Sequence, residues 1–343
     1  MPFKIDRDTL HWLSVIILTL MCLALQGEWT WMAKYPKSFI LPLSDWLNAV
    51  MDWIVDYFGW FFLGVSWTLE WPVKAVRFIL NALPWSVTTF LFCTVAWAAS
   101  GQKLAIFTLF SMLYMLVIGY WSESMNTLSL VAISVPLAIL VGFAFGVWGF
   151  FSDRAARVIM PMLDVLQTVP SFAYLLPILM LFGFGTVVGL IASVLYSFPP
   201  MVRNTILGLR GVSPEVIESG LMSGATPGQL FWQVRIPSSL KQILLGVNQA
   251  TMASLSMVII ASIIGGTSDI GWEVLSQIRK AQFGESLLAG MVIALMAMVI
   301  DRITAGFAAQ SGQYDPEDKT FAQRHRYWIA AVLGATFFYV LAQ

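Results

Sequence analysis

The sequence predicts an all-α protein that crosses a membrane several times. Of its 343 residues, 58% are hydrophobic and 11% are charged, whereas about a quarter of the residues of a soluble globular domain are charged. Apolar runs long enough to cross a bilayer as helices recur along the chain. The alternation of apolar and polar residues that is typical of an outer-membrane barrel is missing.

Nine helical spans account for the apolar runs. The first follows Lys4 and Arg7 like a signal peptide, but no small-x-small cleavage pattern precedes Glu28, so we expect it to remain as a span. Cys22 and Cys93 fall within apolar runs, where we expect small buried hydrophobes. The two histidines have no ligand-spaced companions, so no metal site is expected. The expected spans are 10–26, 84–100, 104–121, 127–151, 159–183, 187–202, 239–265, 286–303 and 327–343.

The segment 27–84 differs from the spans because tryptophans, prolines and polar residues are mixed within it. At helical spacing, an acidic and amide face opposes an aromatic and apolar face, which is typical of a helix in the membrane–water interface. We expect 58–67 to dip deeper as a re-entrant piece. If it spans the membrane instead, the N-terminus lies outside. The residues concerned are Asp45, Asn48, Asp52 and Asp56 on one face, Trp46, Val50, Trp53 and Tyr57 on the other, Trp29, Trp31, Trp60, Trp67 and Trp71, and the interrupting Pro36, Pro42, Pro72 and Pro84.

The basic residues predict the topology. With a cytoplasmic N-terminus, thirteen Lys and Arg residues fall inside and six fall outside, which is the bias of the positive-inside rule. The inside set is Lys4, Arg7, Lys103, Arg154, Arg157, Arg203, Arg210, Arg235, Lys241, Arg302, Lys319, Arg324 and Arg326. The outside set is Lys34, Lys37, Lys74, Arg77, Arg279 and Lys280. This topology places residues 213–237 in the cytoplasm.

The span 159–183 carries Pro161, Pro170 and Pro177, and each proline removes a helix hydrogen bond, so kinks are expected. Two interpretations stay open. Kinked helices can line a transport route, where water solvates the freed carbonyl groups, or the helices can simply pack loosely.

Residue patterns for catalysis are missing. Gly101, Gln102 and Lys103 lack the rest of a Walker A motif, and neither a nucleophile elbow nor a zinc signature is present. Asp164 and the pair Asp301–Arg302 are charged residues near spans, and we expect both to be solvated helix ends. So few intramembrane charges argue against a carrier coupled to protons or sodium ions.

Residues 213–237 predict two short helices joined at an elbow. Ser213 with Pro214 is a good start for a helix, and Gly224 is a natural stop. Thr226 and Gln229 then have the spacing of a capping box, and Pro237 is expected to end the second helix. A structured loop between spans is expected to dock another protein, and an ordinary cytoplasmic loop is the alternative interpretation.

The elbow resembles the cytoplasmic "EAA" loop of ABC importer permeases. The pattern is an acid, two small residues, a glycine after three more residues, and an apolar-x-apolar-Pro ending. Here it is met by Glu218, Ser219, Gly220, Gly224, Val234, Ile236 and Pro237, with Ser219 and Gly220 in place of two alanines.

Three further stretches, 163–185, 197–212 and 246–266, resemble the permease subunits of glycine betaine/proline-type osmoprotectant uptake systems. The resemblance implies a type I ABC importer transmembrane domain with a five-helix core at 127–310. It leaves 1–126 as an N-terminal extension with three spans and 311–343 as a polar linker with a terminal span.

The resemblance also implies an assembly in the bacterial inner membrane. Two ATPase subunits bind ATP and Mg, a second permease copy or a homologue completes the pore, and an external protein binds the solute; no nucleic-acid partner and no cofactor on this chain are expected. Within the elbow, apolar contacts to the ATPase are expected from Val216, Ile217, Leu230, Phe231 and Val234, and register from Glu218 and Arg235.

The expected solute is a small zwitterion or quaternary ammonium compound such as glycine betaine. Trimethylamine N-oxide, choline, a sulfonium analogue or an amino acid are alternatives. Candidates for the permeation path, by their place in the matched spans, are Tyr174, Asn248, Ser254 and Met257. Two rival classes are an ion-coupled secondary carrier, which predicts inverted repeats and midplane charges, and a membrane-embedded enzyme.

Overall fold

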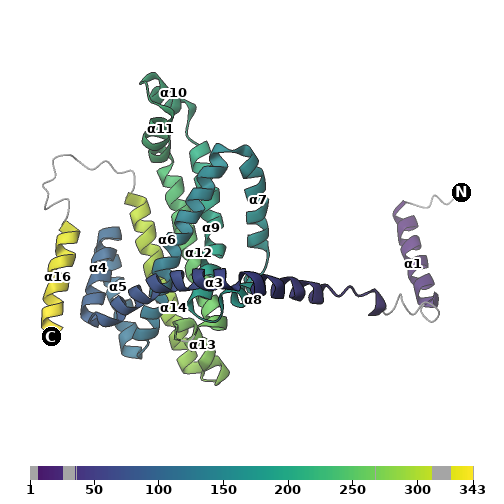
Figure 1. Cartoon of the computed structure of the whole chain (residues 1–343), viewed down its shortest axis with the longest axis horizontal. Coiled ribbons are helices and arrows are strands. Elements are labelled where there is room, and N and C mark those ends of the chain that lie inside the picture. Colours follow the sequence, from purple (N-terminus) through teal and green to yellow (C-terminus); the bar gives the residue numbers. More distant parts are fainter. Residues whose placement is uncertain (1–6, 26–34, 36, 267, 311–325, 343) are drawn as a thin grey trace. The chain divides into compact units, whose positions relative to one another are not determined.

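The computed structural model describes residues 7–25, 35, 37–266, 268–310 and 326–342, and every regular element in these ranges is helical. The predicted all-α class is confirmed. The chain divides into two compact units, Met1–Tyr57 and Phe58–Gln343, and helix α3 (Leu43–Ala82) begins in the first unit and continues into the second (Figure 1).

The first unit holds α1 (Arg7–Leu25), the short η1 (Lys37–Phe39) and the beginning of α3. The side chains of α1 are exposed over most of its length, and the helix is long and apolar enough to cross a membrane. The expected helix around Trp53 and Tyr57 is present, with ring centroids 5.4 Å apart. Trp29 and Trp31, like the polar linker after residue 310, lie outside the described residues.

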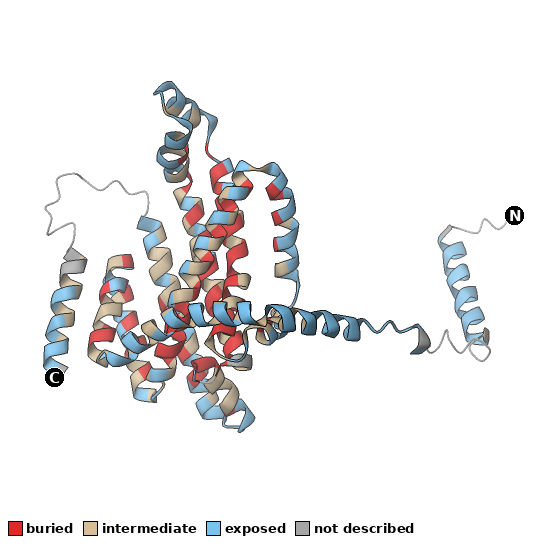
Figure 2. Cartoon of the chain, in the orientation of Figure 1, coloured by how far each residue is buried: buried red, intermediate tan, exposed pale blue. Residues whose placement is uncertain are grey.

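The second unit is a helical bundle built around α6, α9 and α12, where most of the buried side chains gather (Figure 2). After the remainder of α3 its elements are α4 (Trp85–Ser100), α5 (Gln102–Ile118), α6 (Trp121–Phe151), α7 (Asp153–Thr168), α8 (Ser171–Phe182), α9 (Thr186–Arg210), α10 (Pro214–Met222), α11 (Pro227–Gln229), the π-helical turn η2 (Leu230–Arg235), α12 (Ile236–Gly265), α13 (Ile270–Arg279), α14 (Phe283–Gln310) and α16 (Arg326–Ala342).

Glycines bring α6 and α9 into close contact. A Cβ atom added at Gly142 would lie 2.6 Å from the Cβ atom of Met201, and one at Gly146 would lie 2.5 Å from the Cβ atom of Thr205. Small residues four apart on one helix let the backbone of a second helix approach closely, which is how helices associate when lipid supplies no hydrophobic drive between them.

Each predicted span coincides with one helix except 159–183, which takes in parts of both α7 and α8, and four helices form two sharply bent pairs. Among the described residues, five helices are long and apolar enough to cross a membrane, or up to seven if each bent pair counts as one span, and α5 and residues 330–341 are shorter apolar helices. The pair α3 and α4 bends by 109°, and the pair α7 and α8 by 100°. The second bend is at Val169 and Pro170, because the residue before a proline is driven out of the helical region.

Pro72, Pro199 and Pro200 lie within helices, so the expected interruption at Pro72 and the expected end of a span at residue 202 are wrong. Helix α3 runs through Pro72, where the next residue, Val73, is fully buried. Helix α9 passes through Pro199 and Pro200 and ends at Arg210 rather than at residue 202, because the following turns are also buried. A lost hydrogen bond is tolerated where packing on both sides holds the helix. Arg203 therefore lies within a helix and not in a loop.

Two smaller expectations also fail. Helix α14 continues to Gln310, so Asp301 and Arg302 are not at a helix end. Cys22 is exposed and Cys93 is half-buried, so neither is a fully buried hydrophobe. Because a free thiol behaves as a small apolar group, it is tolerated on a helix surface that faces lipid.

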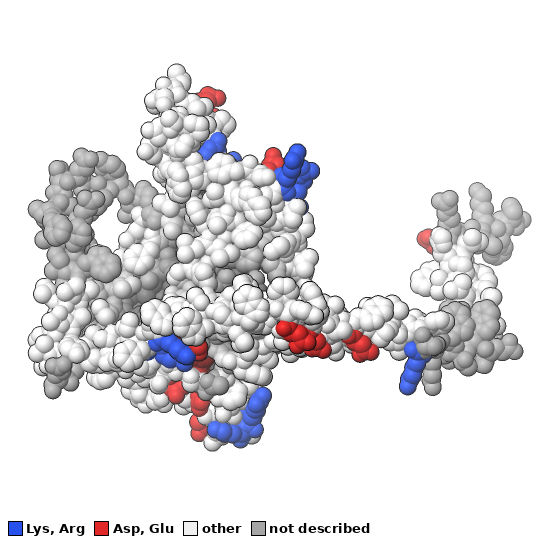
Figure 3. Space-filling model, viewed as in Figure 1, with Lys and Arg blue, Asp and Glu red and all other residues white. Residues whose placement is uncertain are grey.

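Side-chain contacts define two ends of the bundle. At the hairpin end, which carries α10 and α11, Arg210 pairs with Asp153 and Gln310 donates to the Ala98 carbonyl. At the opposite end, Asn126 donates to the Ser268 carbonyl and the Ile270 N–H donates to the hydroxyl of Thr127. On the face shown in Figure 3, charged side chains gather at both ends. Arg154, Arg210 and Arg235 lie at one end and Arg279 and Lys280 at the other, as the basic residues predicted.

Replacing Gly146 tests the close packing of α6 on α9. Gly146→Leu forces a side chain into Thr205, and we expect overpacking to lower the free energy of unfolding by about 1 to 3 kcal/mol, seen as a lower midpoint of thermal unfolding in detergent. Gly290→Leu is the control, because nothing lies within 4 Å of a Cβ atom there. Equal losses in the two variants would contradict the packing.

Candidate coupling hairpin

Residues 213–237, here called the coupling hairpin, fold back on themselves at Gly224. Helix α10 starts with Ser213 at the N-cap and Pro214 in the first turn. At its other end Gly224 has a φ angle of +77°, a left-handed conformation that favours glycine. Its N–H donates to the Leu221 carbonyl (2.9 Å), and the Ala225 N–H donates to the Gly220 carbonyl (3.1 Å). The predicted helix start and stop are confirmed.

The chain restarts at the predicted capping box. The hydroxyl of Thr226 accepts a hydrogen bond from the Gln229 N–H, and the side-chain carbonyl of Gln229 accepts one from the Thr226 N–H (2.9 Å). The expectation that Pro237 ends the second helix is wrong. The chain stays helical from Pro227 to Ile263, and Pro237 directly follows the π-helical turn η2, where the regular i→i−4 hydrogen bonds are already interrupted.

Gly220 lets the two arms of the hairpin touch. A Cβ atom at this position would lie 2.9 Å from Leu230 Cδ1 and 3.2 Å from Val234 Cγ2. Leu230 and Val234, both half-buried, therefore pack against Gly220 within the hairpin. The requirement for a small residue at Gly220 follows from this contact, whereas Ser219 is exposed.

Phe231 and Arg235 anchor the hairpin to the bundle. Phe231 is buried, with its ring 5.0 Å from the ring of Phe151 between centroids. The guanidinium of Arg235 lies 5.2 Å from the centroid of Phe150 and donates to the Leu209 carbonyl at 3.3 Å, a cation–π contact combined with a hydrogen bond. Both residues were expected to face a partner, but they contact α6 and α9 of their own chain.

The surface that the hairpin offers to solvent is partly acidic and partly apolar. Glu218 is exposed. The pKa of the Glu215 carboxyl is lowered by hydrogen bonds from the Glu215 backbone N–H and from the Ser213 side chain. Two large apolar side chains project beside the turn: Met222 is 91% exposed and Trp232 is 62% exposed. Sequence reasoning missed both, although large apolar residues at the turn of a polar loop are a usable signal for a contact surface.

The four predicted path residues do not share one surface. Met257 is fully buried in a cluster against which Tyr174 packs, and the Tyr174 hydroxyl is buried without a hydrogen-bond partner. The hydroxyls of Ser254 and Ser134 are 2.8 Å apart in the interior. Asn248 accepts a hydrogen bond from Thr304 (2.8 Å).

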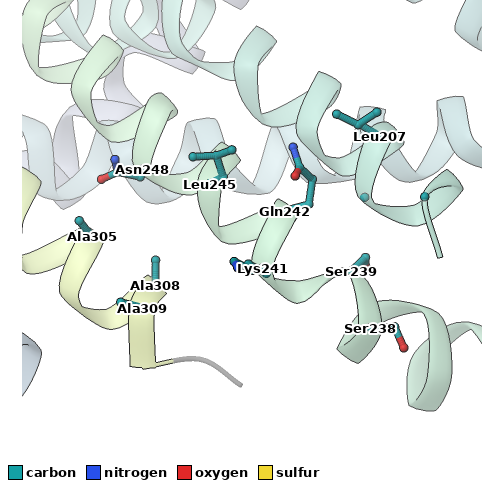
Figure 4. A pocket seen from close by; sticks show the side chains of 12 residues that line it. Leu207, Ser238, Ser239, Lys241, Gln242, Leu245, Asn248, Ala305, Ala308 and Ala309 are labelled. Carbon is teal, nitrogen blue, oxygen red and sulfur yellow. The ribbon is translucent and has the colours of Figure 1, made fainter. Parts of the chain in front are cut away.

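Asn248 also lines a groove of about 590 Å³ between α9, α12 and α14 near the hairpin end (Figure 4). Most of its lining residues have small or apolar side chains, and Lys241 and Gln242 add polar groups. The described residues contain no group of three or more His, Cys, Asp or Glu side chains placed to hold a metal ion.

Comparison with known proteins identifies a single family. Residues 134–310, just over half of the chain, match the family described as binding-protein-dependent transport system inner membrane component. The chain is 38% identical over 264 residues to the glycine betaine transport system permease protein OpuAB of Bacillus subtilis, covering 77% of this chain and 93% of that protein.

Two further relatives extend the comparison. The glycine betaine/proline betaine transport system permease protein ProW of Escherichia coli is 36% identical over 272 residues, covering 79% of this chain and 77% of that protein. The trimethylamine N-oxide transport system permease protein TmoV of Ruegeria pomeroyi is 32% identical over 324 residues, covering 91% of this chain but 49% of that protein.

A larger side chain at Gly220 should separate the two arms of the hairpin. We expect Gly220→Leu to raise the rate of amide hydrogen exchange in residues 214–235 about tenfold or more, because local opening becomes easier. Ser219→Leu is the matched control, since its side chain points into solvent. Unchanged exchange in Gly220→Leu, or an equal rise in both variants, would count against the packed hairpin.

Proposed function

Because the chain belongs to the family of binding-protein-dependent transport system inner membrane components, we propose that it imports a small quaternary ammonium or zwitterionic solute such as glycine betaine. It is the multi-pass membrane subunit of an ABC importer in the bacterial inner membrane, and a partner subunit hydrolyses the ATP. The observation that carries the proposal is a packed hairpin, continuous with α12, on a chain whose relatives are glycine betaine permeases.

The proposed assembly contains two ATPase subunits, which bind ATP and Mg, and a second permease that is a copy or a homologue of this chain. A binding protein outside the membrane delivers the solute. The exposed surface of the coupling hairpin, with Glu218, Met222 and Trp232, is the part that we propose to seat in a groove of the ATPase. The hairpin end of the bundle then faces the cytoplasm, in keeping with the excess of basic residues predicted there.

Continuity between the hairpin and the bundle supports a mechanical role. Helix continues without a break from Pro227 through η2 into α12, as far as Ile263, and Phe231 and Arg235 attach the same segment to α6 and α9. A displacement of the hairpin by the closing ATPase is therefore passed to three core helices together. Such rigid-body motion is one way in which helical bundles open alternately to either side.

The solute is proposed from the relatives' names. OpuAB and ProW are named for glycine betaine, whereas TmoV is named for trimethylamine N-oxide and a Bacillus subtilis relative, OpuBB, for choline. All of these compounds carry a substituted nitrogen, which aromatic side chains bind by cation–π attraction. Competition of unlabelled solutes against radiolabelled glycine betaine, in vesicles holding the whole importer, tests the assignment. Uptake that excess glycine betaine does not reduce would overturn it.

Uptake measurements in the same vesicles distinguish an ATP-driven importer from an ion-coupled secondary carrier. An importer transports only when ATP, the ATPase and the binding protein are present, whereas a carrier transports with this chain alone and an ion gradient. Gradient-driven uptake by the chain alone would refute the proposal.

Reversing or adding charge on the exposed surface of the hairpin should uncouple transport. We expect Glu218→Lys, which inverts the charge of an exposed face, and Gly224→Asp, which adds a negative charge at the exposed turn, to abolish ATP-driven uptake while membrane insertion is unchanged. Gln233→Lys, on an exposed part of the same hairpin, is the control. Normal uptake in the first two variants at normal expression would contradict the coupling role.

A further inference from the structure

Helix α7 has three distinct faces. One face is buried and carries Ala155, Ala156, Ile159 and Leu163. A second, exposed face is apolar and carries Val158, Met162 and Val165, which are 71%, 48% and 58% exposed. The third face is exposed and polar, with Arg157, Asp164 and Thr168 at helical spacing. A helix surrounded by lipid needs no polar face.

Asp164 on this polar face pairs with Arg203 of α9, with the carboxylate 2.5 Å from the guanidinium. A second pair, Asp153 with Arg210 at 2.7 Å, joins the same two helices at the hairpin end. Eleven residues separate the two acids and seven separate the two arginines, which is about 16 Å and about 10 Å at 1.5 Å per residue. Asp164 therefore lies about one turn before the end of α7 at Thr168 and is held by an ion pair to a second helix.

Taking the Asp153–Arg210 pair at the hairpin end as the level of the membrane surface, the Asp164–Arg203 pair lies within the hydrocarbon layer, which is about 30 Å thick. Yet the side chains of Asp164 and Arg203 are 64% and 39% exposed, and the Arg203 Nε atom is buried without a partner. Charged groups at this depth face protein or a water-filled cavity and not lipid. The bend at Val169 and Pro170 also indicates a hydrated or protein-lined surface, because helix ends leave backbone groups that only water or protein can satisfy.

We propose that the polar face of α7, together with Arg203 of α9, lines the aqueous route of the solute, and that the Asp164–Arg203 ion pair is a charged station on that route. The inference rests on the proposed function, since it takes a second permease to close the route on its open side. A zwitterion carries one charge of each sign. It can therefore replace both internal partners at once, its carboxylate on the guanidinium and its ammonium on the carboxylate, without leaving either protein charge unpaired.

Thiol labelling distinguishes the two exposed faces. The chain has two cysteines, so Cys22→Ser with Cys93→Ser gives a cysteine-free background. Thr168→Cys and Val165→Cys lie less than one turn apart and therefore at nearly the same depth. In the assembled importer in lipid nanodiscs, a membrane-impermeant maleimide should label Thr168→Cys about tenfold faster or more, since only a hydrated thiol forms the reactive thiolate. Excess glycine betaine should slow that labelling.

Equal rates at the two positions, faster labelling of Val165→Cys, or no labelling of either would overturn the inference. The cysteine-free importer is assayed for uptake in parallel. If it does not transport, the proposed function is at fault, and if it transports without a difference between the faces, only the inference is at fault.

The ion pair has its own readout in the same preparation. Asp164→Asn should reduce the rate of uptake about tenfold without changing the amount of ATPase that copurifies, because exposed ion pairs contribute little to stability. Asp153→Asn breaks the Asp153–Arg210 pair, and an importer with this substitution should transport at the normal rate. Normal uptake by Asp164→Asn, or an equal loss in both variants, would exclude a role of the Asp164–Arg203 pair in the route of the solute.

Discussion

The contact between the coupling hairpin and the end of α6 is the interaction on which the proposed mechanism depends. Phe231 packs against Phe150 and Phe151, and Arg235 adds a cation–π contact and a hydrogen bond to a free carbonyl group at the end of α9. Without this anchor the hairpin would be attached to the bundle only through the chain on either side. We propose that with it the hairpin and three core helices move as one body.

Packing within the hairpin explains the residue types along it. Gly220 is small because Leu230 and Val234 pack on it, and Gly224 is a glycine because the turn needs a positive φ angle. The side chains that remain for a partner are the exposed ones, chiefly Glu218, Met222 and Trp232. Internal packing and the surface proposed for the partner are thus contributed by different residues of one short segment.

The sequence predicts the helices well and their ends poorly. Apolar runs located the long apolar helices, and the capping residues Thr226 and Gly224 located the turn, because both signals are local. The behaviour of Pro72, Pro199, Pro200 and Pro237 was not predictable, since a proline ends a helix only where neighbouring turns cannot hold it in place. Phe231 and Arg235 were assigned to the surface for the same reason: their partners, Phe150, Phe151 and Leu209, are remote in sequence. The pairing of Asp164 with Arg203 likewise needed the fold.

Site-specific photo-crosslinking in the assembled importer tests the central claim most directly. A photoreactive amino acid is placed at Met222, which is 91% exposed on the hairpin, and separately at Ile278, which is 59% exposed on α13 at the opposite end. The account predicts that position 222 crosslinks to the ATPase and position 278 does not. A crosslink from 222 to the external binding protein, or to the ATPase from 278 alone, would contradict it.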